Sequence, residues 1–398
     1  IPFDLWYHYI MKKRGDSMIY LDNAATTKPH EDVIKSYTQM NQHYFFNPNS
    51  PHGAGIKIAH LIDKARKNIK QYLNLNDKFD VIFTSGATES NNIVLQGMAQ
   101  TKKRFGNTIL TTKMEHPSVL ETMRALEEQG FNLKYINTTA DGKLDLNSLE
   151  KLLNDDVILV TCMHVNNIMG QVQPIEEISK MLEAYPKVHF HVDGVQGFGK
   201  IPLDINLMDS YSLSAHKFHG LKGSGILVLN QLRSIKPIIF GGGQEYGIRS
   251  GTVNAPVNVS LAKAMRFMQE NCEQHRKVLY AKGSEIRSFI ENYEGIVINS
   301  PTDAVPYILN ISFPGVKGEV LVNAFSKFDI YLSTTSACSS KKSSHNETLK
   351  AMGMSNSRIE GSIRISITYD ITEEQIETFK EAFNKVYIEV KELLKNEL

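Results

Sequence analysis

The sequence TSGATES at residues 84–90 follows directly on an apolar run, Val81–Thr84, and opens a stretch with helical spacing. Short apolar runs are typical of buried strands, and longer amphipathic stretches are typical of helices. The same order of strand, turn and helix repeats from Asp80 to Asn230. This alternation predicts an α/β fold in which a mostly parallel sheet has helices on both faces.

Short apolar runs in this region are predicted as buried strands, and the amphipathic stretches Ser118–Gln129 and Pro174–Ala184 as helices between them. The runs are Val81–Thr84, Thr108–Thr111, Leu133–Ile136, Val157–Cys162, Val188–Val192 and Gly225–Leu229. After Ala255-Pro256 the pattern changes to a long helical stretch over 257–293, strands near 296–298 and 308–312, a helix near 318–327, a strand at 362–367 and a closing helix from Thr372. Such a mixed order predicts a smaller α+β domain.

These patterns divide the chain into three parts. We expect a large domain over residues 29–255 and a smaller, mainly C-terminal domain made of residues 18–28 and 256–398. Residues 1–17 begin with apolar and aromatic side chains and place three basic residues after them. Because a secretory signal has the opposite order, we expect this segment to be an extension or a cloning remnant.

The composition excludes several classes of protein. With 44 basic and 43 acidic side chains the net charge is +1, so no basic surplus points to nucleic acid. No apolar run approaches the ~20 residues of a membrane span. Three cysteines, Cys162, Cys272 and Cys338, are too few and too scattered for a disulfide framework or a zinc site. We therefore expect a cytoplasmic protein without a metal centre.

Two charged residues stand where the predicted strands end. Lys217 closes the sequence SAHK and precedes several glycines, so it could approach a cofactor carbonyl and form a Schiff base, although most lysines are simply solvated. Asp193 ends a strongly apolar strand, where an ionised carboxylate is costly unless it is paired. A pyridinium nitrogen would supply that partner, and a helix N-cap is the alternative. Gln196 could then bind the phenolic oxygen of the same cofactor.

The small residues at 84–90 let backbone N–H groups approach an anion at the positive end of a helix. The stretch lacks the lysine of a P-loop and the spacing of a dinucleotide fingerprint, which disfavours nucleotides. Alone it is a weak signal, because Ser or Thr before a helix is usually only a cap. Together with Asp193 and Lys217 on one α/β domain, it indicates pyridoxal phosphate.

Nine motifs occur in a fixed order along the chain. They are YLDNAATT at 20–27, TSGATESNN at 84–92, EHPSV at 115–119, MHVNN at 163–167, HVDGVQ at 191–196, SLSAHK at 212–217, GGGQEYGIRSGT at 241–252, SACSS at 336–340 and SIRIS at 362–366. With these motifs the chain resembles the cysteine desulfurases of the NifS/IscS class, first group, which are fold-type I pyridoxal phosphate enzymes of the class-V aminotransferase family. The resemblance runs from about Ile19 to the last helix.

The resemblance implies a role for residues in each motif. The catalytic residues would be Cys338, Lys217 and His116, the last stacked on the cofactor ring. The ring would also be held by Asn167, Asp193 and Gln196, and the phosphate by Ala87, Thr88, Ser214 and His216. Thr252 would reach the phosphate bound by a second subunit, which implies a homodimer. Arg364, Asn23 and Asn167 would bind the substrate, for which a bidentate guanidinium suits a carboxylate.

Cys338 stands among Ser, Thr and Lys residues in the stretch Ser333–Ser344, which predicts an exposed, mobile loop. Cys162 lies inside an apolar run and is expected in the core, and Cys272 lies in a helical stretch. The resemblance implies that Cys338 takes the sulfur of L-cysteine as a persulfide, leaves L-alanine and passes the sulfur to an acceptor protein. The acceptor would be an iron–sulfur scaffold or a tRNA-thiolating enzyme.

Three features refine the resemblance. The distance from Cys338 to Gly353 leaves room for a long, unstructured loop, as in the first group. Ile168 stands where the family usually has an acidic residue. The chain ends at Leu398, whereas many relatives that serve iron–sulfur scaffolds extend further, which leaves room for a dedicated acceptor.

Two rival functions remain. The first is another pyridoxal phosphate reaction, such as that of a transaminase, a selenocysteine lyase or a kynureninase-like lyase. The second is a non-catalytic partner protein that keeps only the fold.

Overall fold

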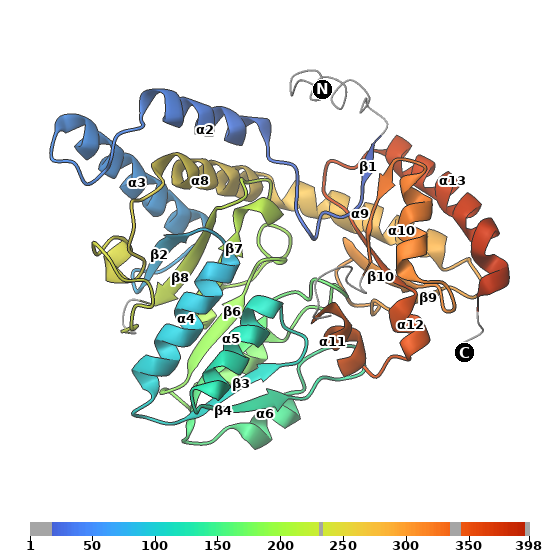
Figure 1. The fold of residues 1–398 in the computed structure, drawn as a ribbon, viewed down its shortest axis with the longest axis horizontal. Helices are drawn as coiled ribbons and strands as arrows, with labels where there is room; N and C mark the ends of the chain where they lie inside the picture. The colour runs from blue at the N-terminus through green and yellow to red at the C-terminus, as the bar shows by residue number, and fades with distance from the viewer. Residues whose placement is uncertain (1–17, 231–233, 335–343, 395–398) are drawn as a thin grey trace. The chain divides into compact units, whose positions relative to one another are not determined.

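The computed structural model describes residues 18–230, 234–334 and 344–394, which fall into two compact units. The large unit comprises Thr26–Asn167 and Gln171–Lys277, and the small unit comprises the other described residues. We expected the large domain to end at residue 255, but the large unit continues to Lys277. It therefore also includes α8 (Ala255–Glu270) and the start of the next helix. Helix α8 belongs to the large unit because it packs along α2 (Glu31–His43) and α3 (Gly53–Tyr72), as Figure 1 shows.

A seven-stranded sheet forms the centre of the large unit, in the order β2-β8-β7-β6-β5-β3-β4. Its strands are β2 (Phe79–Thr84), β3 (Thr108–Thr112), β4 (Asn132–Ile136), β5 (Val157–Met163), β6 (His189–Asp193), β7 (Ser210–Ser214) and β8 (Gly225–Asn230). Each apolar run of this region that was predicted as a strand overlaps one of them, and only Val188 falls outside. Only β8 is antiparallel to its neighbours, so the prediction of a mostly parallel sheet is confirmed.

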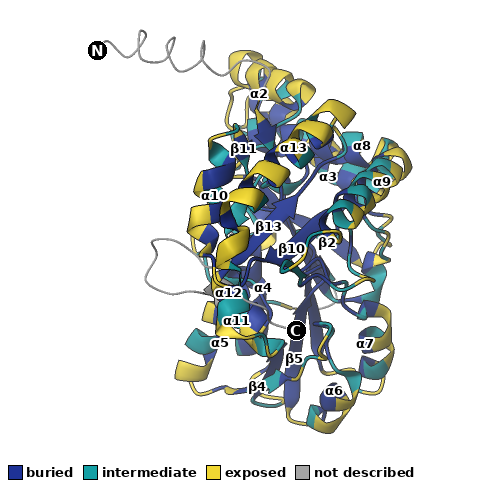
Figure 2. Ribbon diagram, turned by 90° about the vertical axis from the view of Figure 1, so that its right-hand side faces the viewer, coloured by how far each residue is buried: buried dark blue, intermediate teal, exposed yellow. Residues whose placement is uncertain are grey.

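Helices cover both faces of this sheet. The chain moves outward from β2 to β4 through α4 (Ala87–Lys102) and α5 (Pro117–Glu128), and returns through α6 (Leu146–Leu152) and α7 (Ile175–Leu182). Right-handed crossovers therefore place the two pairs of helices on opposite faces, and Figure 2 shows α5 and α7 on either side of β5. The buried face of α4 contributes Ile93, Leu95 and Met98 to the core.

The direction of the strands determines where the motifs meet. Because β8 runs antiparallel to both β2 and β7, these two strands point the same way as β3, β5 and β6. The carboxyl ends of these five strands therefore lie on one edge of the sheet. In open α/β folds, ligands bind at this edge.

Strand β2 forms one edge of the sheet, and three side chains bind its outward-facing backbone groups. The Glu245 carboxylate accepts a hydrogen bond from Phe83 N–H at 2.8 Å, and Arg66 donates one to the carbonyl of Val81. Arg66 also binds both carboxylate oxygens of Glu245 at 2.9 Å. The amide of Val81 is bound by the Asp80 carboxylate at 2.9 Å.

The small unit contains an antiparallel sheet in the order β12-β13-β10-β9 and a separate pair, β1 with β11. Its strands are β1 (Ile19–Tyr20), β9 (Val297–Ile298), β10 (Ile308–Ser312), β11 (Ile330–Tyr331), β12 (Ser333–Thr334) and β13 (Ser362–Ser366). Its helices are the main part of α9 (Cys272–Ile290), α10 (Gly318–Ser326), α11 (Ser344–Ala351), α12 (Asn356–Glu360) and α13 (Glu373–Val390). Short 3₁₀ turns are η1 (Ile205–Leu207), η2 (Ala215–Lys217) and η3 (Glu245–Gly247) in the large unit and η4 (Lys391–Leu393) in the small unit.

Two expectations are wrong in detail. The single helix predicted over 257–293 is two helices, because α8 ends at its C-cap Asn271 and α9 begins at Cys272. The span from Cys338 to Gly353 is not unstructured throughout, since it contains α11. This helix is ordered by Leu349, which is fully buried against Ile168, Met169 and Ile359. Ile168 therefore serves as a packing residue of the small unit.

No helix in the described part of the chain is long and apolar enough to cross a membrane.

Candidate active site

The turn at residues 84–90 joins β2 to a helix whose N-terminus carries no side-chain cap. Gly86 precedes α4 with φ of +154°, a conformation that favours glycine. The next amide, Ala87 N–H, donates to the hydroxyl of Ser214 at 2.8 Å, and Thr88 is exposed in the first helical turn. A Cβ on Gly225 would lie 2.5 Å from Gly86 Cα, so β8 can approach the turn only as glycine. Ala87, Thr88 and Ser214 thus meet at one helix N-terminus, which could hold a phosphate.

His216 and Lys217 lie in η2, directly after β7. Burial first, and then the positive charges of Lys217 and Lys222, lower the pKa of His216 to about 4, so its ring is neutral. A neutral His216 ring could donate one hydrogen bond to a phosphate. It would do so without adding a positive charge to those of Lys217 and Lys222. Lys217 is half-buried. Burial and the charge of Lys217 also lower the pKa of Lys200 to about 7, which places the two lysines near one another.

Asp193 ends β6 with only 6% of its surface exposed. Its carboxylate accepts hydrogen bonds from Asn91 Nδ2 at 2.9 Å and from Val195 N–H at 3.1 Å, both of which are neutral donors. In the part of the chain that the structure describes, no cation forms an ion pair with Asp193. A buried carboxylate in this state is costly, and a protonated ring nitrogen would complete it. The residues present therefore fit a pyridoxal ring.

His116 caps the N-terminus of α5. Its Nδ1 accepts from Ser118 N–H at 3.1 Å and lies 2.8 Å from Ser118 Oγ, and this hydroxyl is in turn bound by Asn91 Nδ2 at 2.9 Å. One buried amide thus links His116 to Asp193. Sequence reasoning missed both Asn91 and Ser118, although each stands inside a quoted motif.

Glu115 was also missed. It is buried next to His116 and accepts a hydrogen bond from Thr112 Oγ1 at 2.8 Å. Burial, which the hydroxyl of Thr112 opposes and the charge of Asp193 reinforces, raises the pKa of Glu115 to about 8. A carboxyl group at this position is therefore mostly protonated at neutral pH, which leaves Asp193 as the negative group of the site.

The remaining predicted residues of the large unit lie at the same edge of the sheet or open to solvent. Asn167 is half-buried in the turn after β5, and Gln196 is buried after β6. Thr252 is exposed and lines a cavity of about 290 Å³ together with Thr84 and Ser85 of the turn.

The small unit holds two predicted substrate-binding residues. Arg364 on β13 is 5% exposed and donates to the Asp22 carboxylate at 2.6 Å. The amide of Asn23 donates to the carbonyls of Tyr20 and Ser366 at 2.9 and 3.0 Å. Asn23 therefore ties the N-terminal strand region to β13. Cys338 lies outside the described residues.

The cysteines that the structure describes are placed as expected. Cys162 is fully buried in β5, where burial raises the pKa of its thiol far above the ordinary value. Cys272 begins α9 and is half-buried. Neither stands among the residues that could hold a cofactor.

A parallel sheet edge that brings together a helix N-terminus, a buried carboxylate and a lysine defines a pyridoxal phosphate enzyme of fold type I. Residues 19–379 match the family model "Aminotransferase class-V". The "NifS/IcsS protein homolog" of Lactobacillus delbrueckii is 39% identical over 93% of this chain and 97% of its own. "Cysteine desulfurase IscS" of Clostridium botulinum is 33% identical over 95% and 96%. A solved structure titled "NIFS-LIKE PROTEIN" superposes with a TM-score of 0.87 at 37% identity, over 94% of this chain and 100% of that chain.

The chain belongs to the class-V aminotransferase family, and within it to the NifS/IscS group of pyridoxal phosphate enzymes.

Proposed function

We propose that this chain is a cysteine desulfurase, which removes the sulfur of L-cysteine and leaves L-alanine. The Clostridium botulinum relative named above carries this activity in its name. The observation that carries the proposal is the buried Asp193, which among the described residues is held by neutral donors, at the same sheet edge as Lys217. This arrangement supports chemistry at the α-carbon of an amino acid.

Pyridoxal phosphate, when bound, supplies an electron sink that weakens the bonds at the α-carbon of an amino acid. Lys217 would hold it covalently and, once released, would move a proton at its Nζ. Asp193 would stabilise the protonated ring nitrogen, while Gln196 and Asn167 would bind the ring hydroxyl. His116 would stack on the ring. The phosphate would be held by Ala87, Thr88, Ser214 and His216.

The sulfur step belongs to Cys338. Its thiol takes one sulfur atom from cysteine and becomes a persulfide, so that thiol plus cysteine give persulfide plus alanine with all atoms balanced. Arg364 would bind the substrate carboxylate by a charge-assisted pair, and Asn23, which follows the Arg364 partner Asp22, would contribute from the same unit. The persulfide sulfur then passes to an acceptor protein, for which iron–sulfur assembly and tRNA thiolation are the two candidate destinations.

The test is production of alanine and sulfide from L-cysteine by the purified holoprotein in excess dithiothreitol, which reduces the persulfide to thiol and sulfide. Cys338→Ala should keep the visible absorbance of the bound cofactor and lose sulfide release, whereas Lys217→Ala should lose the covalent attachment as well. Cys272→Ala is the matched control and should behave like wild type. Unchanged sulfide release in Cys338→Ala would contradict the assignment of the thiol, and a wild-type protein without turnover would contradict the activity.

We further propose a homodimer in which Thr252 contributes to the partner's phosphate site. The segment before Thr252, residues 240–251, carries two exposed aromatic side chains. They are Phe240, which is 83% exposed, and Tyr246, which is 61% exposed. Mixing inactive Thr252→Ala and Lys217→Ala proteins then creates heterodimers. In each heterodimer one of the two sites is complete, because it has its own Lys217 and receives Thr252 from the other subunit. Random exchange should restore about a quarter of the wild-type activity. If mixing restores none, Thr252 serves its own subunit.

A further inference from the structure

The residues assigned to the cofactor ring are joined by a buried hydrogen-bond chain. Asn91, on the inner face of α4, is fully buried and donates from Nδ2 to Asp193 Oδ2 and to Ser118 Oγ, both at 2.9 Å. Ser118 Oγ lies 2.8 Å from His116 Nδ1. A single amide group therefore stands between the carboxylate and the imidazole.

The direction of each hydrogen bond in this chain follows from one negative charge. A carboxylate can only accept, so the side of the Asn91 amide that faces Asp193 must be its NH₂ group. The amide oxygen then faces the other way, where it accepts from Ser212 Oγ at 2.6 Å and lies 3.0 Å from His191 Nε2. Because the oxygen has no hydrogen to give, His191 must carry its hydrogen on Nε2.

The environment of His191 is consistent with this direction. Burial, helped by the neighbouring His189, lowers the pKa of His191 to about 3, so the ring is neutral and has one hydrogen. With that hydrogen on Nε2, Nδ1 is an acceptor, and the hydroxyl of Ser210 lies 2.8 Å from it. Each group on this side of Asn91 thus has a defined role as donor or acceptor, which fixes the amide against rotation by half a turn.

On the other side, the same amide determines the state of His116. The second hydrogen of Nδ2 points at Ser118 Oγ, so the hydroxyl hydrogen is directed away from Asn91 and toward His116 Nδ1. This nitrogen also accepts from Ser118 N–H at 3.1 Å. Two donors on Nδ1 leave no place for a hydrogen there, and the neutral ring must carry its hydrogen on Nε2.

We propose that Asn91 is a positioning residue, which orients the Asp193 carboxylate and, through Ser118, holds His116 in the Nε2–H tautomer. The inference rests on the proposed function, because it is this function that assigns Asp193 and His116 to the cofactor ring. It adds to that function a single buried group that sets the hydrogen-bonding state of both ring contacts. His116 then presents a neutral ring whose only transferable hydrogen is on Nε2.

The chain offers a matched pair of substitutions. Asn91→Ala removes both hydrogen bonds. Asn92→Ala changes the adjacent asparagine, whose amide, among the described residues, binds Thr88 C=O and Gln96 on its own helix. Ser118→Ala cuts the branch to His116 and leaves Asn91 against Asp193. This third variant removes one small hydroxyl and serves if Asn91→Ala does not fold, as judged by its thermal midpoint.

The first readout is the tautomer of His116 at pH 7, from the ¹⁵N shifts of its ring in protein with labelled histidine, assigned by difference from His116→Gln. Wild type and Asn92→Ala should show an unprotonated Nδ1 and a protonated Nε2. Ser118→Ala and Asn91→Ala should shift part of the population to the Nδ1–H form. In Ser118→Ala the nitrogen keeps only the longer bond, from Ser118 N–H at 3.1 Å, and in Asn91→Ala the hydroxyl of Ser118 is free to turn away. An unchanged pattern in a folded Ser118→Ala protein would overturn the link to His116.

The second readout is the dissociation constant of pyridoxal phosphate. A hydrogen bond to a charged group is lost in Asn91→Ala, so we expect binding to weaken by about 10-fold, with wild-type affinity in Asn92→Ala. Equal affinity in the two asparagine variants would overturn the link to Asp193. Failure of the proposed function looks different, because wild type would then release no sulfide while the tautomer difference between Ser118→Ala and Asn92→Ala persists.

Discussion

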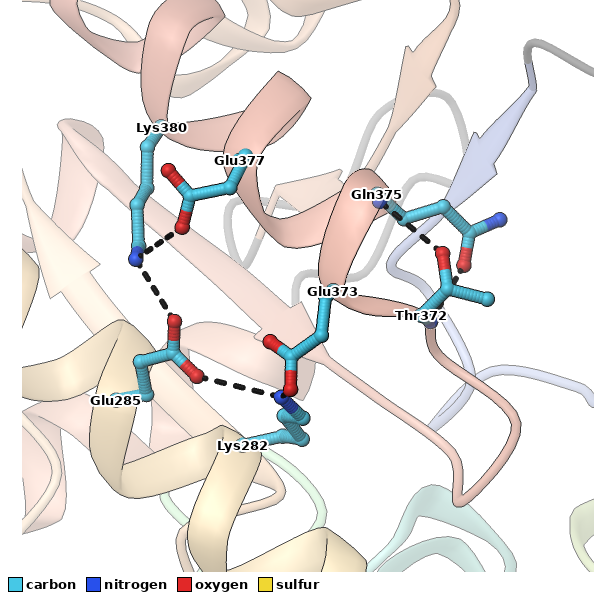
Figure 3. A network of polar contacts seen from close by, with 7 residues as sticks. All are labelled: Lys282, Glu285, Thr372, Glu373, Gln375, Glu377 and Lys380. Carbon is cyan, nitrogen blue, oxygen red and sulfur yellow. Dashed lines mark hydrogen bonds and ion pairs between the residues drawn. The ribbon is translucent and has the colours of Figure 1, made fainter.

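The protein contains two polar networks of opposite character. In the large unit, Asp193, Asn91, Ser118 and His116 form a chain with a single charged member, and the first three are buried. In the small unit, charged groups on α9 and α13 form a network at the surface. Figure 3 shows this network, in which Lys380 binds Glu285 and Glu377 at 2.7 Å each and Lys282 binds Glu285 and Glu373.

The difference lies in what replaces a lost contact. At the surface, water and salt take the place of a missing partner, so each ion pair adds little to stability. In the buried chain, a lost donor leaves an acceptor that nothing else can satisfy. The surface network therefore tolerates substitution, and the buried chain specifies one arrangement. Chemistry that needs a fixed tautomer and a fixed carboxylate is found in the second kind of network.

The largest expected effect concerns pH and Glu115, beside the buried chain. Its folded pKa of about 8 lies above the ordinary glutamate value of 4.5, so between these pH values the folded state keeps a proton that the unfolded state has lost. Stability from this group is complete below about pH 4.5 and is lost as pH rises toward 8. The loss is on the order of 4 kcal/mol.

Glu115→Gln should remove this pH dependence, because the amide does not titrate. Urea unfolding of both proteins from acidic to alkaline pH measures it. The free energy of unfolding of the variant, relative to that of wild type, should increase as pH rises and should be largest above pH 8. A constant difference across the range would contradict a protonated Glu115.

A methyl group added beside the buried chain should cost about 3 kcal/mol or more. In Gly194→Ala the new Cβ would lie 1.8 Å from Cζ of Tyr211, whose ring is 1% exposed. Gly53→Ala is the control, since Gly53 begins α3 at the surface with nothing within 4 Å of a Cβ. Alanine there should be neutral or slightly stabilising. The denaturant midpoints of the two variants should move in opposite directions or differ widely.

A smaller effect is expected at the cap of α13, beside the surface network. Thr372 Oγ1 accepts from Gln375 N–H and Gln375 Oε1 accepts from Thr372 N–H, both at 3.1 Å, as Figure 3 shows. Thr372→Ala should destabilise the protein by about 1 kcal/mol. Thr378→Ala, inside the same helix and exposed, should change stability much less. Equal thermal midpoints for the two variants would argue that the cap adds nothing.

The smallest effect is expected from the surface ion pairs themselves. The hydrogen bond from Lys380 first, and then the nearby lysine charges, lower the pKa of Glu285, so its contribution is present at neutral pH and is lost in acid. Its sign is opposite to that of Glu115. Glu285→Gln should cost less than about 1 kcal/mol at low salt and nothing measurable near ~1 M salt. A salt-independent loss would mean that the surface network resembles the buried one.

The sequence predicted the elements whose signal is local. The strands of the large sheet were recognisable because each is a short run of apolar residues between turns. The two-residue strand β11 was not, because Ile330 pairs with Ile19, at the other end of the chain. The division of the long helix at Asn271 also had no strong local signal, since neither glycine nor proline stands there.

The candidate site was predictable to the same extent. Lys217, Asp193 and the turn at 84–90 stand out through their position after apolar strands. Asn91 does not, because its partners Asp193 and Ser118 are 102 and 27 residues away and only the folded sheet edge brings them together. Glu115 looks like an ordinary acidic residue until its burial is known. Local chemistry thus indicates which groups react, and tertiary contacts decide their state.

The side chains on the outer edge of β2 have a consequence for the protein among its own copies. An edge strand with free N–H and C=O groups is a template on which a strand of another molecule can add. Here Arg66, Glu245 and Asp80 occupy the groups of Val81 and Phe83 that face outward. A second sheet cannot extend this one without first breaking a buried ion pair, so the sheet is closed to stacking into larger aggregates at this edge.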